Sequence, residues 1–178
     1  LYGKWQELLN RNEGETLKKI ICIDGKTMRS NKRKDKAPSH IVTAWSREDG
    51  FSLGQKAVEE KSNEITAIPE LLGKIQIKGQ IVTIDAMGTQ KQIAEEIRRK
   101  RADYVLAVKR NQGSLYEDIK LYFSDEGIQK EVREKGSFSQ TTEKAHGQIE
   151  KREYYQTDEI RWLAQKKEGK GLKSIGME

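Results

Sequence analysis

The hydrophobic residues of this chain gather in short runs, rich in β-branched residues, that are typical of strands. The runs lie at residues 19–24, 40–45, 51–58, 80–85 and 103–108. Asp49-Gly50 falls between the second and third runs and supplies the positive φ angles of a tight turn. These two runs are therefore predicted to form an antiparallel hairpin.

Apolar residues spaced three or four positions apart predict amphipathic helices in the later part of the chain. These helices cover residues 62–75, 89–101 and 114–123. In the first of them Ser62 can cap the start, and Pro69 either opens the main helix or kinks a longer one. Residues 1–16 look like the end of a helical region, whereas residues 136–144 and 148–156 are predicted to pair as a polar hairpin.

The order of these elements predicts an α/β protein with a mixed sheet. The first three strands are expected to be antiparallel, whereas the last two each follow a helix, which permits parallel pairing. Helices are expected on both faces of the sheet. This arrangement matches the ribonuclease H-like fold, in which the first and fourth strands are neighbours at the centre.

The first and fourth predicted strands both end in an aspartate, Asp24 and Asp85. If these strands are parallel neighbours, both carboxylates emerge at the edge where open α/β sheets place their sites. Two carboxylates held together repel each other unless they are protonated or bind a metal, and hard oxygen ligands favour Mg²⁺ or Mn²⁺. Such a site normally needs a third acidic ligand. For either residue alone, a role as a cap or turn former remains the alternative.

Composition narrows the classes of protein to which the chain can belong. Its 178 residues are 34% hydrophobic and 35% charged, with a formal net charge of +6 and a pI of about 9.2. A basic excess favours a polyanionic partner, although this excess is modest. The single cysteine, Cys22, excludes an intrachain disulfide framework and a cysteine-built zinc site. No apolar run is long enough to suggest a membrane span.

Several longer motifs resemble those of bacterial insertion-sequence transposases of the H-repeat-associated type, which belong to the DDE class. In chain order they are Ile23–Arg29 (IDGKTMR), Lys61–Pro69 (KSNEITAIP), Thr83–Gln90 (TIDAMGTQ), Asp103–Lys109 (DYVLAVK) with Asn111-Gln112, and His146–Glu150 (HGQIE) with Arg152. The resemblance covers roughly residues 20–176, and motifs of this length in this order are more specific than any single short pattern.

This resemblance implies a DNA transposase catalytic domain that performs metal-dependent phosphodiester cleavage and strand transfer at transposon ends. It implies that Asp24 and Asp85 are catalytic and bind Mg²⁺ or Mn²⁺. Residues beside these aspartates are then expected to bind DNA, namely Lys26, Arg29, Lys109 and Asn111. The alternatives are a solvated loop for the first two and an ordinary turn for the last two. The resemblance implies that the partner is DNA, both the transposon ends and the target, in the bacterial cytoplasm at the nucleoid. No membrane partner is expected, and a homodimer is the assembly to test.

The resemblance departs from the family pattern at the third acid. The family's catalytic glutamate lies in a Trp-x-Ile-Glu type context, which does not occur after residue 156 here. We therefore expect that glutamate to lie beyond residue 178, which would make this chain an incomplete catalytic domain that is inactive by itself. Glu150 is the internal candidate, although a glutamate on a strand more often pairs with a base such as Arg152.

The expected domains follow from these motifs. They are the end of an N-terminal helical region at 1–16, a ribonuclease H-like core at 17–125, and a β-rich insertion with a small hairpin at 126–178 that is truncated before the final catalytic helix. Two other functions remain open. One is a catalytically silent DNA-binding or assembly fragment, and the other is a ribonuclease H-like nuclease unrelated to transposition.

Overall fold

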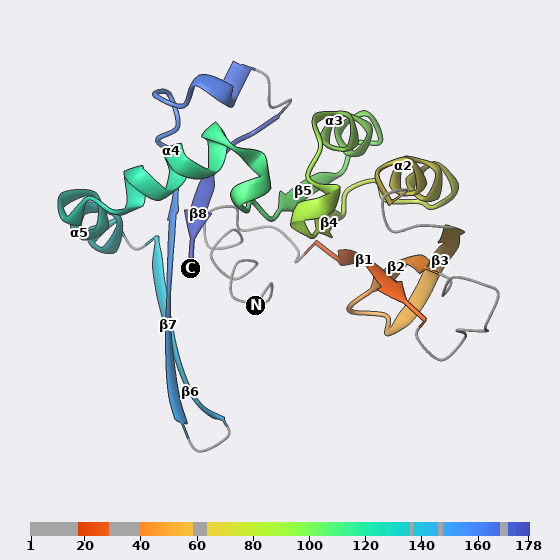
Figure 1. The fold of residues 1–178 in the computed structure, drawn as a ribbon, viewed down its shortest axis with the longest axis horizontal. Coiled ribbons are helices and arrows are strands. Elements are labelled where there is room, and N and C mark those ends of the chain that lie inside the picture. The colour runs from red at the N-terminus through yellow and green to blue at the C-terminus, as the bar shows by residue number, and fades with distance from the viewer. Residues whose placement is uncertain (1–17, 29–39, 59–63, 136, 146–147, 168–170) are drawn as a thin grey trace. The chain divides into compact units, whose positions relative to one another are not determined.

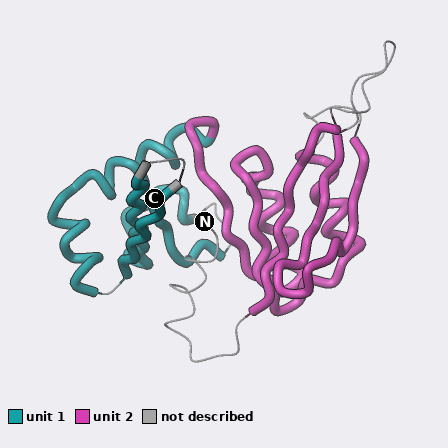
Figure 2. The backbone as a smooth tube through the Cα atoms, turned by 90° about the horizontal axis from the view of Figure 1, so that it is seen from below, with its two compact units in different colours: residues 1–17, 112–178 teal, residues 18–111 magenta. Residues whose placement is uncertain are grey.

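The computed structural model describes residues 18–28, 40–58, 64–135, 137–145, 148–167 and 171–178. These residues fall into two compact units (Figure 2). In chain order we call residues 18–111, magenta in Figure 2, the first unit and residues 112–178, teal in Figure 2, the second unit. The helical region predicted at residues 1–16 lies outside the described residues.

Residues 18–111 form a five-stranded sheet with the strand order β3-β2-β1-β4-β5 (Figure 1). The strands are β1 (Ile20–Thr27), β2 (His40–Ser46), β3 (Phe51–Val58), β4 (Ile81–Ile84) and β5 (Asp103–Leu106). β1 pairs antiparallel with β2, and β2 with β3, whereas the β1–β4 and β4–β5 pairs are parallel. The predicted mixed sheet is therefore confirmed, with the first and fourth strands adjacent at its centre.

The two α-helices among the described residues of this unit, α2 (Glu64–Lys74) and α3 (Lys91–Arg99), pack on one face of the sheet. The core between them includes Ile21, Ile23, Val42, Ala44, Ile68, Leu71, Leu72, Val82, Ile84, Ile93 and Ile97. Helices were also expected on the opposite face, and none is seen there among the described residues of this unit. The periodicity of a sequence identifies a helix, but it does not tell which face of a sheet the helix covers. α2 continues through Pro69, and its expected cap, Ser62, lies outside the described residues.

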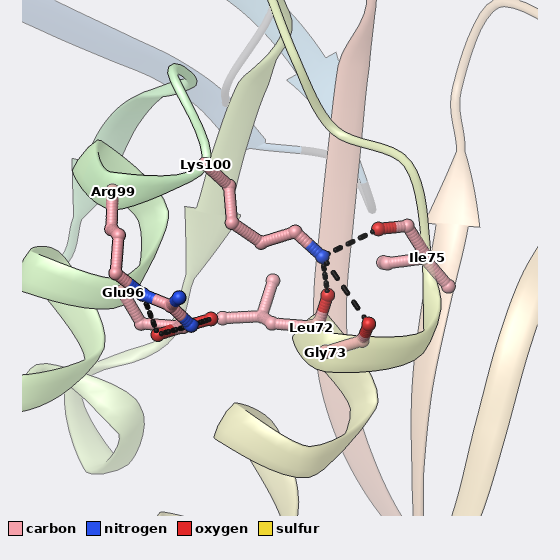
Figure 3. A network of polar contacts seen from close by, with 6 residues as sticks. All are labelled: Leu72, Gly73, Ile75, Glu96, Arg99 and Lys100. Atoms are coloured by element: carbon pink, nitrogen blue, oxygen red, sulfur yellow. Dashed lines mark hydrogen bonds and ion pairs between the residues drawn. The ribbon is translucent and has the colours of Figure 1, made fainter.

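The C-terminal end of α2 is held by Lys100, which directly follows α3 (Figure 3). The Lys100 Nζ donates a hydrogen bond to the backbone oxygen of Ile75 at 2.8 Å and another to that of Leu72. The last carbonyls of a helix have no partner within the helix, and a cation there also interacts favourably with the helix dipole. Lys100 therefore ties α2 and α3 together as one layer.

The two arginines at the end of α3 have anionic partners within the same unit. Arg99 donates to both carboxylate oxygens of Glu96, from Nη2 at 2.7 Å and from Nε at 2.9 Å (Figure 3). Arg98 pairs with Asp103 at the start of β5 and donates to the backbone oxygen of Ala102 at 3.0 Å. The contacts of Arg98 join the end of α3 to the strand that follows it, whereas the Arg99–Glu96 pair lies within α3.

Residues 112–178 form a second unit around a three-stranded sheet with the order β6-β7-β8. Its elements are α4 (Ser114–Phe123), α5 (Glu126–Glu134), β6 (Phe138–Ala145), β7 (Gln148–Thr157) and β8 (Ile175–Met177). β6 and β7 pair antiparallel as the predicted polar hairpin. Phe123 of α4 packs in the core of this unit with Tyr155 and Ile160, so the unit begins at residue 112, whereas the expected insertion begins at residue 126.

Among the described residues, none of the helices combines the length and the hydrophobicity that a membrane span requires.

Candidate metal site

The pairing of β1 with β4 sets the position of the two predicted metal ligands. The parallel ladder runs from Ile20↔Ile81 to Ile23↔Ile84, so the next residues are Asp24, within β1, and Asp85, directly after β4. The prediction that the first strand ends at Asp24 is wrong, because pairing with β2 extends β1 to Thr27. Adjacent strands lie about 5 Å apart. The register therefore brings the two aspartates to the same edge of the sheet, next to each other.

Alternation along the strands also places these aspartates on the same face. Ile23 and Ile84 pack into the core beneath the helices, and successive side chains of a strand point to opposite faces. Asp85 keeps an extended backbone, with φ −67° and ψ 167°, so the alternation continues through it. Asp24 and Asp85 thus lie on the face away from α2 and α3, and both are exposed.

The carboxylate of Asp85 has a local partner as well. Its Oδ1 accepts a hydrogen bond from the backbone N–H of Met87 at 2.7 Å, and Asp85 thereby caps a short 3₁₀ helix, η3 (Ala86–Gly88). Thr89 fixes the far end of this turn, since its Oγ1 donates to the backbone oxygen of Ala107 at 2.6 Å. The cap function considered from the sequence is therefore confirmed for Asp85, and it orients the carboxylate.

Gly88 allows η3 to lie close against the core. It is buried, and a Cβ atom built on it would clash with Cγ2 of Ile84 and would lie 2.7 Å from Cδ1 of Ile68. Only a residue without a side chain fits between the central strand and α2 at this point. Within the TIDAMGTQ motif, the spacing between Asp85 and Gly88 thus sets the position of Asp85 through packing as well as through hydrogen bonds.

Asp24 lies beside the first predicted DNA-binding residue. The Nζ of Lys26 is 3.7 Å from Oδ2 of Asp24, and the two side chains are 80% and 57% exposed. A pair this exposed contributes little to stability, so Lys26 remains accessible to another anion. Arg29, the second predicted DNA-binding residue of this segment, lies outside the described residues.

The segment after β5 approaches η3. Nδ2 of Asn111 donates a hydrogen bond to the backbone oxygen of Ala86 at 3.2 Å, directly after Asp85. Lys109 follows the same strand and is exposed. The structure therefore brings Asn111 to the edge of the candidate site, where it also has a structural contact.

Two buried polar residues behind this site were not predicted from the sequence to have a role. His40 and Glu64 are 2% and 7% exposed, and Oε1 of Glu64 lies 2.5 Å from Nε2 of His40, away from the direction of a regular hydrogen bond. Glu64 belongs to the KSNEITAIP motif. The signal in the sequence that could have indicated its burial is its place near the start of a predicted helix, in line with the apolar positions of that helix.

Glu150, the internal candidate for a third acidic ligand, belongs to the second unit. Its Oε2 lies 2.8 Å from Nη2 of Arg152, and the hydrogen bond that Arg152 donates to the Glu150 carboxylate is the main cause that raises the pKa of Arg152. The alternative pairing with Arg152 is therefore confirmed. Within the residues that the structure describes, no group of three His, Cys, Asp or Glu side chains is arranged to hold a metal ion.

The strand order of the first unit, with Asp24 in β1 and Asp85 directly after β4, is that of a ribonuclease H-like domain. The family model of the transposase DDE domain matches residues 15–169, and the chain belongs to this family.

Relatives of the chain agree with the resemblance seen in its motifs. The putative transposase YncI of Escherichia coli K12 is 46% identical over 155 residues, which are 85% of this chain and 60% of the relative. The H repeat-associated putative transposase YbfD of the same strain is 42% identical over 137 residues, 76% of this chain and 53% of the relative. An uncharacterized protein in the dhlA 3′ region of Xanthobacter autotrophicus is 39% identical over 158 residues, 88% of this chain and 52% of the relative. The chain spans about half the length of these curated relatives.

Two solved structures are similar at low identity. A piggyBac transposase synaptic complex with hairpin DNA matches 57% of this chain and 25% of that chain, at 12% identity and a TM-score of 0.43. A simian T-cell lymphotropic virus intasome matches 65% of this chain and 45% of that chain, at 16% identity and a TM-score of 0.41.

Proposed function

We propose that this chain is part of the catalytic domain of a DNA transposase, in which Asp24 and Asp85 bind Mg²⁺ or Mn²⁺ and phosphodiester bonds are cleaved and transferred at transposon ends. The observation that carries the proposal is the register of β1 and β4, which puts both aspartates at one edge and on one face of the sheet. Membership of the transposase DDE domain family supports this class of reaction.

The donor atoms fit a hard divalent cation. Asp24 and Asp85 offer exposed carboxylate oxygens from adjacent strands, the type of ligand that Mg²⁺ and Mn²⁺ prefer. When bound, such ions supply a Lewis acid for the charge that develops on the phosphate during in-line displacement. The bond from Met87 to Asp85 restricts the rotation of that carboxylate before any ion binds.

DNA would meet this edge of the sheet through cations and polar groups of the same unit. Lys26 lies on the same face as Asp24, and Asn111 lies next to the peptide that follows Asp85. With Arg29 and Lys109, these are the residues that we propose contact phosphates. Such contacts position the nucleic acid without reading its sequence.

Calorimetric titration of the full-length protein with Mn²⁺ tests the metal site. We expect Asp24→Asn and Asp85→Asn each to weaken binding by about tenfold or more, since each removes a charged ligand. Asp125→Asn is the matched control, because Asp125 caps α5 by accepting from the N–H of Ile128 and asparagine can do the same. Binding that is unchanged in both site variants would exclude a shared ion at these residues.

Incubation with a transposon-end duplex separates the functions that the sequence left open. Metal-dependent cleavage that both site variants lose supports the transposase. Salt-sensitive binding that survives Asp85→Ala, with no cleavage by the wild-type protein, would favour a silent DNA-binding fragment. Preferred cleavage of RNA–DNA hybrids would favour an unrelated nuclease. The same assay on the 178-residue chain tests whether it is inactive by itself, and sedimentation with and without DNA tests the homodimer.

A further inference from the structure

A buried polar pair lies behind the part of β1 that follows its pairing with β4 and that begins with Asp24. His40 is the first residue of β2 and Glu64 the first residue of α2, and both are buried. The His40 ring is also held on its other side, where Nδ1 lies 3.0 Å from Oγ1 of Thr27 in β1. The pair thus connects the beginnings of a strand and a helix with the end of β1.

The end of β1 extends beyond its pairing with β4. The parallel ladder stops at Ile23↔Ile84, whereas the antiparallel ladder with β2 continues from Asp24↔Thr43 to Thr27↔His40. In the described part of the sheet, residues 24–27 are therefore paired with a neighbouring strand on one side only. We call residues 24–27 the β1 extension.

Gly25 lets the polar pair approach this extension closely. A Cβ atom built on Gly25 would lie 2.6 Å from Nε2 of His40 and 2.7 Å from Cδ of Glu64, and closer still to the carboxylate oxygen Oε1. Both side chains therefore rest on the backbone of the residue that follows Asp24. Contacts of this kind leave the peptide little freedom to move towards the helices.

The pair is not placed to touch a substrate at the candidate site. Gly25, like Ile23, belongs to the positions of β1 that face the helices, whereas Asp24 faces the other way. A buried acid and base are also a costly way to fill space, because apolar residues of similar volume are often as stabilising or more so. What a polar pair can add at such a place is a defined geometry.

We propose that His40 and Glu64 are positioning residues that fix the β1 extension and thereby the carboxylate of Asp24 relative to Asp85. The effect of this pair on metal binding rests on the proposed function, whereas its effect on the position of the β1 extension does not. Metal ligands must be held to within a fraction of an ångström, so a looser extension lowers affinity even though both aspartates remain.

Glu64→Gln tests the proposal, because glutamine keeps the shape and removes the charge of the carboxylate. Amide hydrogen exchange in the full-length protein, followed by mass spectrometry, is the first readout. We expect exchange in the β1 extension to be about tenfold faster than in the wild type, while β4 changes little. Leu72→Ala is the control, since it creates a cavity in the same helix far from Gly25 and lowers stability without touching the pair.

Mn²⁺ titration of the same variants is the second readout. We expect Glu64→Gln to weaken Mn²⁺ binding by about tenfold. Leu72→Ala should leave the affinity within about twofold of the wild type, even if it lowers the melting temperature as much as Glu64→Gln does. Gly25→Ala, which pushes the extension away from the pair, is expected to weaken binding as well. If Glu64→Gln does not fold, His40→Gln and Gly25→Ala provide the same comparison.

The two readouts separate this inference from the proposed function. Exchange in the β1 extension that is no faster in Glu64→Gln than in Leu72→Ala overturns the positioning role, whatever the metal data. Selective loosening of the extension, in a protein whose wild type binds no Mn²⁺ through Asp24 and Asp85, leaves the positioning of the strand standing and refutes the metal site. Selective loosening with unchanged Mn²⁺ affinity overturns the link between the two.

Discussion

Replacing Gly88 by alanine tests whether close packing of η3 sets the position of Asp85. The added methyl group would overlap Cγ2 of Ile84 and lie 2.7 Å from Cδ1 of Ile68. Ile84 belongs to a central strand that is buried throughout, so it cannot move without disturbing the sheet. Overpacking of this kind costs about 1–3 kcal/mol, and with two neighbours affected we expect about 2 kcal/mol. For a unit of this size that corresponds to a fall in melting temperature of about 10 °C.

Gly73→Ala is the matched control for this experiment. Gly73 lies in α2, and a Cβ atom there would meet nothing within 4 Å. Alanine should therefore stabilise the helix, by about 0.5–1 kcal/mol. Differential scanning calorimetry of the two variants should give shifts of opposite sign. A Gly88→Ala protein that is as stable as the wild type would refute the packing argument, and Mn²⁺ titration of this variant would show whether Asp85 has moved.

Three further predictions concern charged groups of the first unit. Lys100→Met removes the cation at the end of α2 and should lower the free energy of unfolding in urea by about 2 kcal/mol. Lys78→Met, at an exposed position, should change it by no more than about 0.5 kcal/mol, and equal effects of the two variants would contradict the role of Lys100. The ammonium of Lys19 lowers the pKa of Asp49 from its ordinary value of 3.8, so the stability that Asp49 contributes is present above that value and is lost as the pH falls through the lower folded pKa. The difference in melting temperature between wild type and Asp49→Asn should therefore shrink as the pH falls from about 6 to about 2.5, and a constant difference would contradict this. Lys26→Ala should weaken DNA binding for all sequences and make the salt dependence shallower by about one phosphate contact, and an unchanged slope would remove Lys26 from the DNA contacts.

The five strands and their pairing could be predicted from the sequence because each leaves a local signal. Buried runs such as 19–24 and 80–85 stand out from their polar surroundings, and Asp49-Gly50 marks the hairpin. That the first and fourth strands are neighbours was predicted from the match of the element order to the ribonuclease H-like fold, and their parallel pairing confirms it, although β1 runs on to Thr27. These features depend on periodicity and on chain order, which a sequence shows directly.

The polar pair of His40 and Glu64 could not be predicted in this way. Its members come from different elements and meet only because Gly25 has no side chain. The same holds for the fit of Gly88 against Ile68. Close approaches between distant segments have no period, so a motif can mark such residues without giving the reason for them.

The ion pairs at the end of α3 have a consequence for how nucleic acid is attracted to the protein. Much of the drive for DNA binding comes from small ions set free when protein cations replace them along the phosphate chain. Arg98 and Arg99 already have carboxylate neighbours, and the ammonium of Lys100 is directed into backbone carbonyls. To engage a phosphate, each of these groups would first have to give up a partner of its own. The steepness of binding against ionic strength should therefore report on other cations, and removing Arg98, the less exposed of the two arginines, should lower the stability of the fold before it alters that slope.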